Sequence, residues 1–367
     1  MSRYQTTGKL RGRCVVPPPI PEWTEEMEEE QHKWDEEHPS EDEDESSEEE
    51  GEEGEEEEET KEGGEEGEGD SSSDEETDYD DWEDAEVHEC IFRLSHQYHL
   101  RELLNEGEHH CYLAFHRGRS VVIKLSPPLD SGRAPKEVRI LLRLKGHPHI
   151  QELIAWYRIK EFYATVSPEY PYTSFRRIFK AKAVDGELPE AKQARLQNDQ
   201  RRMRSFFRQL FETLAFIHER GVIHRDIKPS NLMWHDEKEW LTVIDFDVST
   251  FDREEGKGHT RKIGTKPYRA PEVVEQRPYG NKVDMYSAGV LFAQAMYGAS
   301  EDLNEETLDH KNVKKWIKRL RRQKKGRKAF NATKDLALRL LNYDPKRRPT
   351  AQEVLQHAYF QAEKKET

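Results

Sequence analysis

Residues 224–231 hold three side chains that together could transfer a proton beside a metal ion. The stretch reads His-Arg-Asp-Ile-Lys-Pro-Ser-Asn and supplies Asp226, Lys228 and Asn231. A carboxylate can accept the proton of a hydroxyl group, a lysine can neutralise developing negative charge, and an amide oxygen can ligate a hard cation. The complete string is far more specific than a bare His-Arg-Asp, which arises in many solvated loops. It predicts an active site.

Asp245 offers a second hard oxygen ligand for the same cation. It lies at the end of the apolar strand predicted for 241–244. If its carboxylate faces Asn231, the two side chains form the kind of magnesium site that nucleoside triphosphate chemistry requires.

Lys124 and Glu137 form a second candidate pair, upstream of these residues. Lys124 closes a predicted strand, and Glu137 stands near the start of the helix that follows. A lysine on its own at a strand end is usually a surface residue. A glutamate on an adjacent helix would fix its flexible stem so that it can contact phosphates.

The pattern of apolar residues predicts the elements that position these side chains. Three short strands, a helix starting near Pro135 and a further strand pair precede a connector at 167–170. After a polar excursion over 181–200, a long buried helix spans 203–217 and ends at Gly221. The predicted strands are 98–104, 111–115, 120–125, 150–157, 162–166, 232–234 and 241–244, and the later helices are 284–297, 308–322, 331–342 and 350–357. A strand-rich part thus leads into a helix-rich part, which is typical of an α+β protein with two lobes.

The charge of the chain is divided very unevenly. Residues 22–86 contain 38 Asp or Glu against two Lys, whereas the whole chain has a net charge of only −17. Such a segment cannot bury enough apolar surface to offset charge repulsion and conformational entropy. We expect 1–87 to be a disordered region that is highly acidic from 22, 88–170 to form the strand-rich N-lobe and 171–367 the helix-rich C-lobe.

Cysteine usage and hydropathy bear on the compartment. Cys14, Cys90 and Cys111 are too few and too scattered for a disulfide framework or a zinc site, which favours a reducing compartment. No signal peptide and no run of about 18 apolar residues is evident. We expect a soluble intracellular protein with no membrane partner, in the nucleus or the cytoplasm.

Further motifs give the chain a resemblance to the eukaryotic protein kinases, from about residue 95 to 360. Ala270-Pro271-Glu272 matches the family's Ala-Pro-Glu, and Asp284 opens a string that matches its Asp-x-Trp-Ser-x-Gly. The segment 341–350 also matches, with Arg348 the implied partner of Glu272. By resemblance, Lys228 and Thr265 mark a serine/threonine kinase. The run 268–270 is similar to that of the cyclin-dependent and MAP kinases, and it also fits the kinases that trigger replication origins.

The resemblance implies a bilobal kinase fold, ATP and Mg²⁺ as cofactors, and a protein as substrate. It makes Asp226 the base, Lys228 a charge on the transferring phosphoryl group, and Asn231 and Asp245 the metal ligands. The implied regulatory residues are Thr260, as a site of activating phosphorylation, and Arg225, as the partner of that phosphate. An activating subunit is a further expectation. The residues implied to bind the nucleotide are Lys124, Glu137, Gly107, Val122 and Met233.

Three departures from the family pattern bear on nucleotide binding. Only Gly107 remains of the glycine-rich loop, over 105–112, so backbone amides can approach phosphates less closely. Val122 replaces an alanine and narrows the adenine pocket. Asp247 replaces the glycine of Asp-Phe-Gly, where Asp tolerates a left-handed backbone better than most residues. The expected function is that of an active protein kinase, and the alternative is a pseudokinase that serves as an interaction module.

Residues 311–328 form a strongly basic run, opposite in charge to the acidic arm 22–86. Residues 311–328 contain 11 Lys or Arg and no Asp or Glu, and the apolar stripe that includes Trp316 predicts a helix. This helix could pack against the C-lobe through its apolar stripe and leave its basic face in solvent. The run 318–328 is similar to a nuclear-import signal, which favours the nucleus, and nucleic acid is not expected as the main ligand. The acidic arm could lie across this surface or gather basic protein substrates, and an acidic binder of basic proteins is a third possible class of function.

Overall fold

The structure is a computed structural model that describes part of the 367-residue chain. The described residues are 84–106, 109–126, 134–159, 162–170, 173–174, 189–253, 258–297, 313, 317–318, 321–322 and 328–361. Gly107, the acidic residues 22–83, Trp316 and most of the basic run 311–328 lie outside them, so the expectations for these residues stay predictions.

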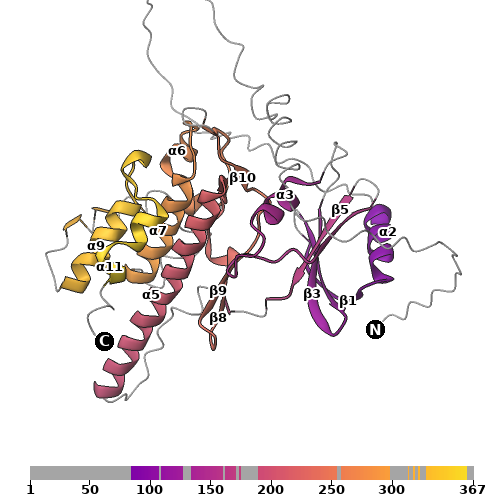
Figure 1. Cartoon of the computed structure of the whole chain (residues 1–367), viewed down its shortest axis with the longest axis horizontal. Helices are drawn as coiled ribbons and strands as arrows, with labels where there is room; N and C mark the ends of the chain where they lie inside the picture. Colours follow the sequence, from indigo (N-terminus) through magenta and orange to yellow (C-terminus); the bar gives the residue numbers. More distant parts are fainter. Residues whose placement is uncertain are drawn as a thin grey trace, which may run out of the picture.

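A five-stranded antiparallel sheet forms the N-lobe (Figure 1). The strand order is β1-β2-β3-β5-β4, with β1 (His99–Glu106), β2 (His110–His116), β3 (Arg119–Ser126), β4 (Ala155–Ile159) and β5 (Phe162–Pro168). Alternate residues of β3, namely Val121, Ile123 and Leu125, are buried in the lobe's core. Because side chains alternate across a strand, the intervening Lys124 points to the opposite face of the sheet.

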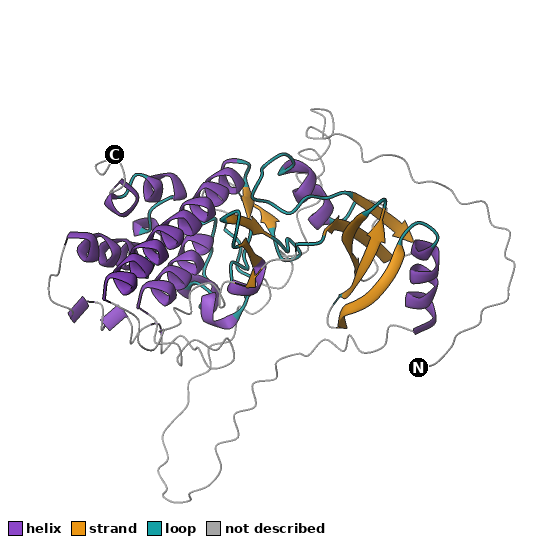
Figure 2. Cartoon of the chain, turned by 90° about the horizontal axis from the view of Figure 1, so that it is seen from below, coloured by secondary structure: helices purple, strands orange, loops and turns teal. Residues whose placement is uncertain are grey.

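Helix α2 (Asp84–Ser95) packs beside this sheet, as Figure 2 shows, and corrects a predicted boundary. Order was expected from residue 88, but the helix begins at Asp84. Val87, Cys90 and Leu94 are buried and belong to the same core as the sheet. Their spacing of three and four residues is a helical stripe, so burial of this stripe stabilises four residues that the acidic composition had assigned to the arm.

Helices dominate the C-lobe, as expected from the sequence (Figure 2). The helices with described bounds are α5 (Pro189–Glu219), α6 (Pro271–Val274), α7 (Lys282–Tyr297), α9 (Lys328–Leu340), α10 (Ala351–Leu355) and α11 (Ala358–Gln361). The long helix predicted for 203–217 begins earlier, at Pro189, within the stretch 181–200 that was expected to be a polar excursion. None of the helices described by the structure combines the length and hydropathy needed to cross a membrane. Together the sheet and the helices confirm the predicted α+β class.

Two small sheets of the C-lobe frame the residues that could do chemistry. β7 (Val222–Ile223) pairs with β10 (Thr250–Phe251), and β8 (Leu232–His235) lies between β6 (Thr173–Ser174) and β9 (Trp240–Val243). The stretch 224–231 connects β7 to β8, and Asp245 follows β9. Pairing of β8 with β9 therefore brings the two halves of the predicted metal site to the same edge.

A buried ion pair holds the lower part of the C-lobe together. The Arg348 guanidinium donates to both carboxylate oxygens of Glu272, at 2.5 and 2.6 Å, and both side chains are fully buried. Arg348 also donates to the carbonyl oxygens of Asn342 and Lys282. The partner implied for Glu272 is thus present, and one guanidinium joins the segment after α9 to α6 and to the start of α7.

Replacing Arg348 by methionine should cost about 3–5 kcal/mol of unfolding free energy, because Glu272 would be left buried without its counter-ion. Urea unfolding of Arg348→Met measures this cost. The matched control is Arg347→Met, since Arg347 has 77% of its side chain exposed and pairs with Asp344 at only 3.5 Å. That control should change stability by less than about 1 kcal/mol. Equal, small effects of both substitutions would show that the buried pair is not an anchor.

Candidate active site

Lys124 lies among three carboxylates that come from both lobes. Its Nζ is 3.4 Å from Glu137 Oε1 on α3 (Lys136–Arg143) and 3.3 Å from Asp245 Oδ1, and it forms a closer ion pair with Asp247. Potential ligand atoms of the three carboxylates lie within 4.8 Å of one another. The predicted contact between Lys124 and Glu137 is therefore present. Asp247, expected only as a tolerated replacement, adds a third acid to the cluster.

The charges of this cluster depend strongly on one another. Burial alone would lower the pKa of Lys124, but the three carboxylates outweigh it, and the pKa is raised well above its usual value. Burial also raises the pKa of Glu137, with a further contribution from the hydrogen-bonded Asp247. Burial opposes ionisation of Asp247, but Lys124 and the hydrogen bond from His109 outweigh it, so that pKa is lowered. By distance, Asp247 is the acid that lies closest to Lys124.

Asp226 is held by a network of donors from its own loop and from Thr265. Its Oδ1 accepts hydrogen bonds from Thr265 N at 3.0 Å and Thr265 Oγ1 at 2.8 Å. Lys228 Nζ lies 2.8 Å from Oδ2, and Asn231 Nδ2 donates to the same oxygen at 3.1 Å. Burial raises the pKa of Asp226, but the hydrogen bond and charge of Lys228 and the hydrogen bond of Thr265 outweigh it and lower the pKa. Asp226 is thus an oriented, ionised carboxylate.

Thr265 owes its position to the glycine before it. Gly264 has φ +92°, and a Cβ at this position would lie 2.4 Å from the carbonyl oxygen of Arg225. Glycine allows both the left-handed backbone and this close approach. The segment 264–265 can therefore lie directly against the Asp226 loop.

Backbone hydrogen bonds fix the strand end that precedes Asp245 beside Asn231. Ile244 N donates to the Asn231 carbonyl oxygen at 3.0 Å, and the Asp245 amide donates to Gln151 Oε1 at 3.0 Å. Asp245 has φ +66°. Phe246 is buried against the His224 ring, which directs the two flanking acids, Asp245 and Asp247, toward Lys124. This left-handed backbone lies at Asp245, where the strand ends, and Asp247 is not among the described residues with positive φ.

This arrangement fits a hard divalent cation. Asn231 uses its amide nitrogen on Asp226, which leaves the amide oxygen as the ligand atom. The Asp245 side chain is 38% exposed, so one of its oxygens can face a solvent-accessible ion. Carboxylate and amide oxygens are the ligands that Mg²⁺ prefers. The assignment of Asn231 and Asp245 as ligands of such an ion stays a prediction.

Asp284 anchors the loop that carries Asp226. It is fully buried and accepts the backbone N–H groups of His224 at 2.9 Å and Arg225 at 2.8 Å, while His218 Nε2 lies 2.9 Å away. Burial alone would raise the pKa of Asp284, but the His218 hydrogen bond outweighs it and lowers the pKa. The Asp284 carboxylate thus fixes the backbone of the two residues that precede Asp226, the candidate base.

Arg225 connects this loop to the segment that carries Thr260. Its Nε donates to the Val248 carbonyl oxygen at 2.5 Å, and its NH1 donates to the Tyr279 hydroxyl at 3.5 Å. Tyr279 donates in turn to the carbonyl oxygen of Arg261, at 2.8 Å. Thr260 itself is exposed. The structure thus links Arg225 to the neighbourhood of Thr260 through Tyr279.

The remaining residues assigned to nucleotide binding lie on strands that border the site. Val122 is half-buried on β3, between Leu113 and Ser167 in register. Met233 is half-buried on β8, opposite Thr242. From the degenerate loop, His109 is described, and its Nε2 lies 2.8 Å from Asp247 Oδ2. This contact was not predicted; the only sequence signal for it was the acid that replaces glycine at 247.

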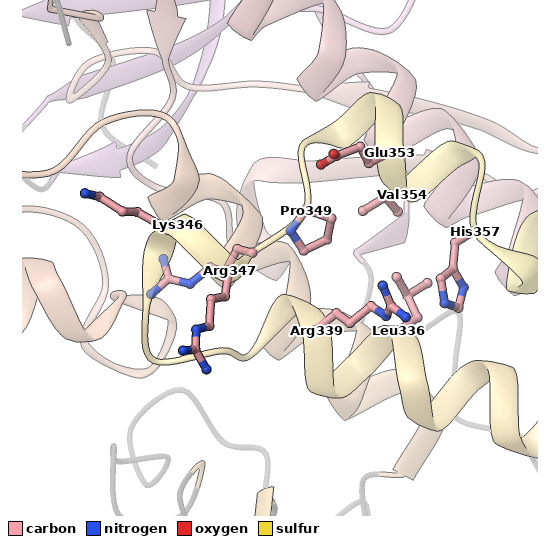
Figure 3. A pocket seen from close by; sticks show the side chains of 9 residues that line it. Leu336, Arg339, Lys346, Arg347, Pro349, Glu353, Val354 and His357 are labelled. Atoms are coloured by element: carbon pink, nitrogen blue, oxygen red, sulfur yellow. The ribbon is translucent and has the colours of Figure 1, made fainter.

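A separate groove of about 390 Å³ lies in the C-lobe, between α9, η4 (Pro345–Arg347) and α10 (Figure 3). Several of its cations are neutralised by acids: Arg339 pairs with Asp335 at 2.7 Å, and Arg347 with Asp344 at 3.5 Å. None of the residues placed around Lys124 or Asp226 lines it. The groove is therefore distinct from the candidate active site.

Comparisons with known proteins agree with this geometry. The family model described as a protein kinase domain matches residues 101–360. Calcium-dependent protein kinase 14 of Arabidopsis thaliana is 30% identical over 251 residues, which are 65% of this chain and 42% of that protein. The liver/testis isoform of the phosphorylase b kinase gamma catalytic chain of Mus musculus is 30% identical over 241 residues, 62% of this chain and 53% of that one. The match thus spans about half the length of these curated relatives.

Proposed function

The chain belongs to the protein kinase family, and from that premise we propose that it is an active serine/threonine kinase. The proposed reaction transfers the γ-phosphoryl group of ATP to a protein hydroxyl, with Mg²⁺ as cofactor. The observation that carries the proposal is the Asp226 carboxylate, which Thr265 and Asn231 hold by hydrogen bonds and which lies beside Lys228.

Each residue of this network has a physical role in the proposed reaction. Asp226 accepts the proton of the attacking hydroxyl, and its contacts with Thr265 fix the oxygen that does so. Lys228 lies close enough to Asp226 to neutralise charge on the group in transfer. Asn231 and Asp245 would hold Mg²⁺, which neutralises phosphate charge when bound. Lys124 would contact the phosphates. Positioning and charge neutralisation are the main requirements of phosphoryl transfer, and these residues can supply both.

A pseudokinase is the second candidate, and one observation favours it. Lys124 is already paired with Asp247, so phosphates must compete for it. The loss of glycines from 105–112 works in the same direction. A pseudokinase of this kind would fold normally and would not transfer phosphate.

Magnesium-dependent transfer of phosphate from ATP to a basic protein separates the two candidates. Asp226→Asn and Lys124→Met should each lower kcat/KM by about 10²-fold or more, because each removes a group that acts on the transferring atoms. Asp236→Asn is the control, since Asp236 contacts Arg202 on the exposed surface of the C-lobe. Activity that survives in both active-site variants would contradict the assignment. Absence of activity in the unaltered chain would favour the pseudokinase.

Phosphorylation of Thr260 is proposed as an activating modification. Thr260 is exposed, and Arg225 lies near it through Tyr279, so a phosphate there could bring the guanidinium into a new charge-assisted contact. The grouping with cyclin-dependent, MAP or origin-triggering kinases and the need for an activating subunit stay predictions alongside it.

Thr260→Ala should lower the activity of protein purified from cells by about tenfold, if a phosphate orders the segment through one charged contact. Phosphatase treatment of the unaltered chain should lower activity equally, and should not affect Thr260→Ala. Full activity of both Thr260→Ala and the phosphatase-treated protein would show that activity does not require a phosphate on Thr260.

The acidic arm is proposed to gather basic protein substrates or to lie on the basic run 311–328. The opposite charges of the two segments support this proposal. The basic run also supports a nuclear location, which a fluorescent fusion with Lys324 and Lys325 replaced by alanine would test. Loss of nuclear accumulation is expected, and unchanged accumulation would contradict the proposal.

Deleting residues 22–83 tests the arm and leaves helix α2 intact, because α2 begins at Asp84. If the arm gathers substrate, deletion should raise the KM for a basic protein and reduce the dependence of KM on salt, since about 0.15 M salt screens charges beyond ~8 Å. If the arm masks the site, deletion should instead lower KM. An unchanged rate and salt dependence would show that the arm has no role in catalysis.

A further inference from the structure

We propose that Asp247 is a positioning residue that holds Lys124 in the nucleotide-free protein and competes with the phosphates of ATP for it. This inference rests on the proposed function, because it concerns the same site. It gives a role to the acid that replaces the glycine of Asp-Phe-Gly, and it makes nucleotide affinity depend on that one side chain.

The first argument is the geometry around the lysine ammonium group. Asp247 Oδ2 forms the closest of the ion pairs to Lys124 Nζ, while Asp245 and Glu137 lie at 3.3 and 3.4 Å. An ammonium group has three N–H donors, and here three carboxylates face it. A phosphate oxygen can therefore reach Lys124 only by displacing a carboxylate. Asp247 is the one with no other assigned part in the reaction, since Glu137 fixes the lysine stem and Asp245 is a metal ligand.

The second argument is the link that Asp247 makes to the roof of the site. His109 comes from the loop over 105–112 that covers the phosphates in the family pattern, and its Nε2 lies 2.8 Å from Asp247 Oδ2. The same Asp247 oxygen thus contacts both Lys124 on β3 and His109 in the 105–112 loop. The two contacting side chains, His109 and Asp247, are only 17% and 16% exposed. Asp247 therefore links Lys124 on β3 to His109, the residue that precedes β2.

The excess of acidic side chains around Lys124 also supports this role of Asp247. Glu137, Asp245 and Asp247 surround a single lysine, so an approaching triphosphate meets more acid than base. A glycine at 247 would offer neither a competing carboxylate nor a partner for His109. Removing the charge of Asp247 should therefore strengthen nucleotide binding, although removing a buried charge partner ordinarily weakens a site.

Titration of the full chain with Mg-ATP tests this inference. Asp247→Asn keeps the shape of the side chain and removes its charge, and it should lower the Kd for Mg-ATP by about tenfold or more, the usual effect of one charged contact. Asp247→Gly should do the same. Asp247→Glu retains a carboxylate and should stay within about threefold of the unaltered chain. His109→Gln should lower Kd by less, since it frees the roof and leaves Lys124 paired.

Adenosine serves as the matched control ligand. It lacks phosphates, so its affinity should be the same for the unaltered chain and for Asp247→Asn. In kinetic assays Asp247→Asn should lower the KM for ATP more than it changes kcat. A change that merely loosened the fold would alter adenosine and Mg-ATP affinity together, and urea unfolding of each variant identifies such a case.

Unchanged or weaker Mg-ATP binding by Asp247→Asn and Asp247→Gly would overturn the inference, as would the absence of binding by all variants. If Asp247→Asn does not fold, Asp247→Gly and His109→Gln decide in its place. The proposed function fails separately. If no variant transfers phosphate but Asp247→Asn binds Mg-ATP more tightly, the chain is a pseudokinase and the role of Asp247 stands. If the unaltered chain transfers phosphate and the Asp247 variants bind no better, only the role of Asp247 is wrong.

Discussion

The contact of Lys124 with carboxylates from both lobes is the interaction on which the rest of the site depends. Lys124 and Glu137 come from the N-lobe, whereas Asp245 and Asp247 follow β9 in the C-lobe. Charges in a poorly solvated place interact far more strongly than in water, and they are costly when unpaired. The cluster therefore couples the position of the two lobes to the position of one ammonium group. The same group is the one that ATP would need.

The C-lobe supplies rigidity to the other half of the site. Asp284 fixes the backbone at His224 and Arg225, and Gly264 allows Thr265 to approach Asp226. These contacts hold the candidate base in one orientation before substrate arrives. Such preorganisation is worth more in phosphoryl transfer than any covalent participation by the protein. Asp226 is thus positioned for proton transfer, whereas Lys124 is held by Asp247.

The sequence predicted much of this architecture because most of it depends on local patterns. Short runs rich in apolar and β-branched residues predicted the strands near 120–125 and 162–166, and helical spacing predicted the helix near 203–217. The start of α2 was missed because the acidic composition concealed a short stripe at Val87, Cys90 and Leu94. Packing of these three side chains against the sheet stabilises the helix despite the acidic composition around it.

Contacts between distant residues were predicted only where a known motif implied them. Arg348 was assigned to Glu272 through resemblance, and the pair is present. No motif implied the contact of Asp247 with His109, which lie 138 positions apart in the sequence. No sequence signal indicated the left-handed backbone at Asp245. The sequence showed that residue 247 was unusual, and only the fold shows what it touches.

The most direct test of the account is the unfolding temperature of the purified chain in millimolar ATP, with and without Mg²⁺. A ligand that binds only the native state stabilises it by about 2.7 kcal/mol at one hundred times its Kd. We expect a magnesium-dependent rise in the unfolding temperature that Asp245→Asn abolishes, because Asp245 would hold the metal. No rise at any millimolar concentration, with the chain folded, would contradict the claim that this site binds Mg-ATP.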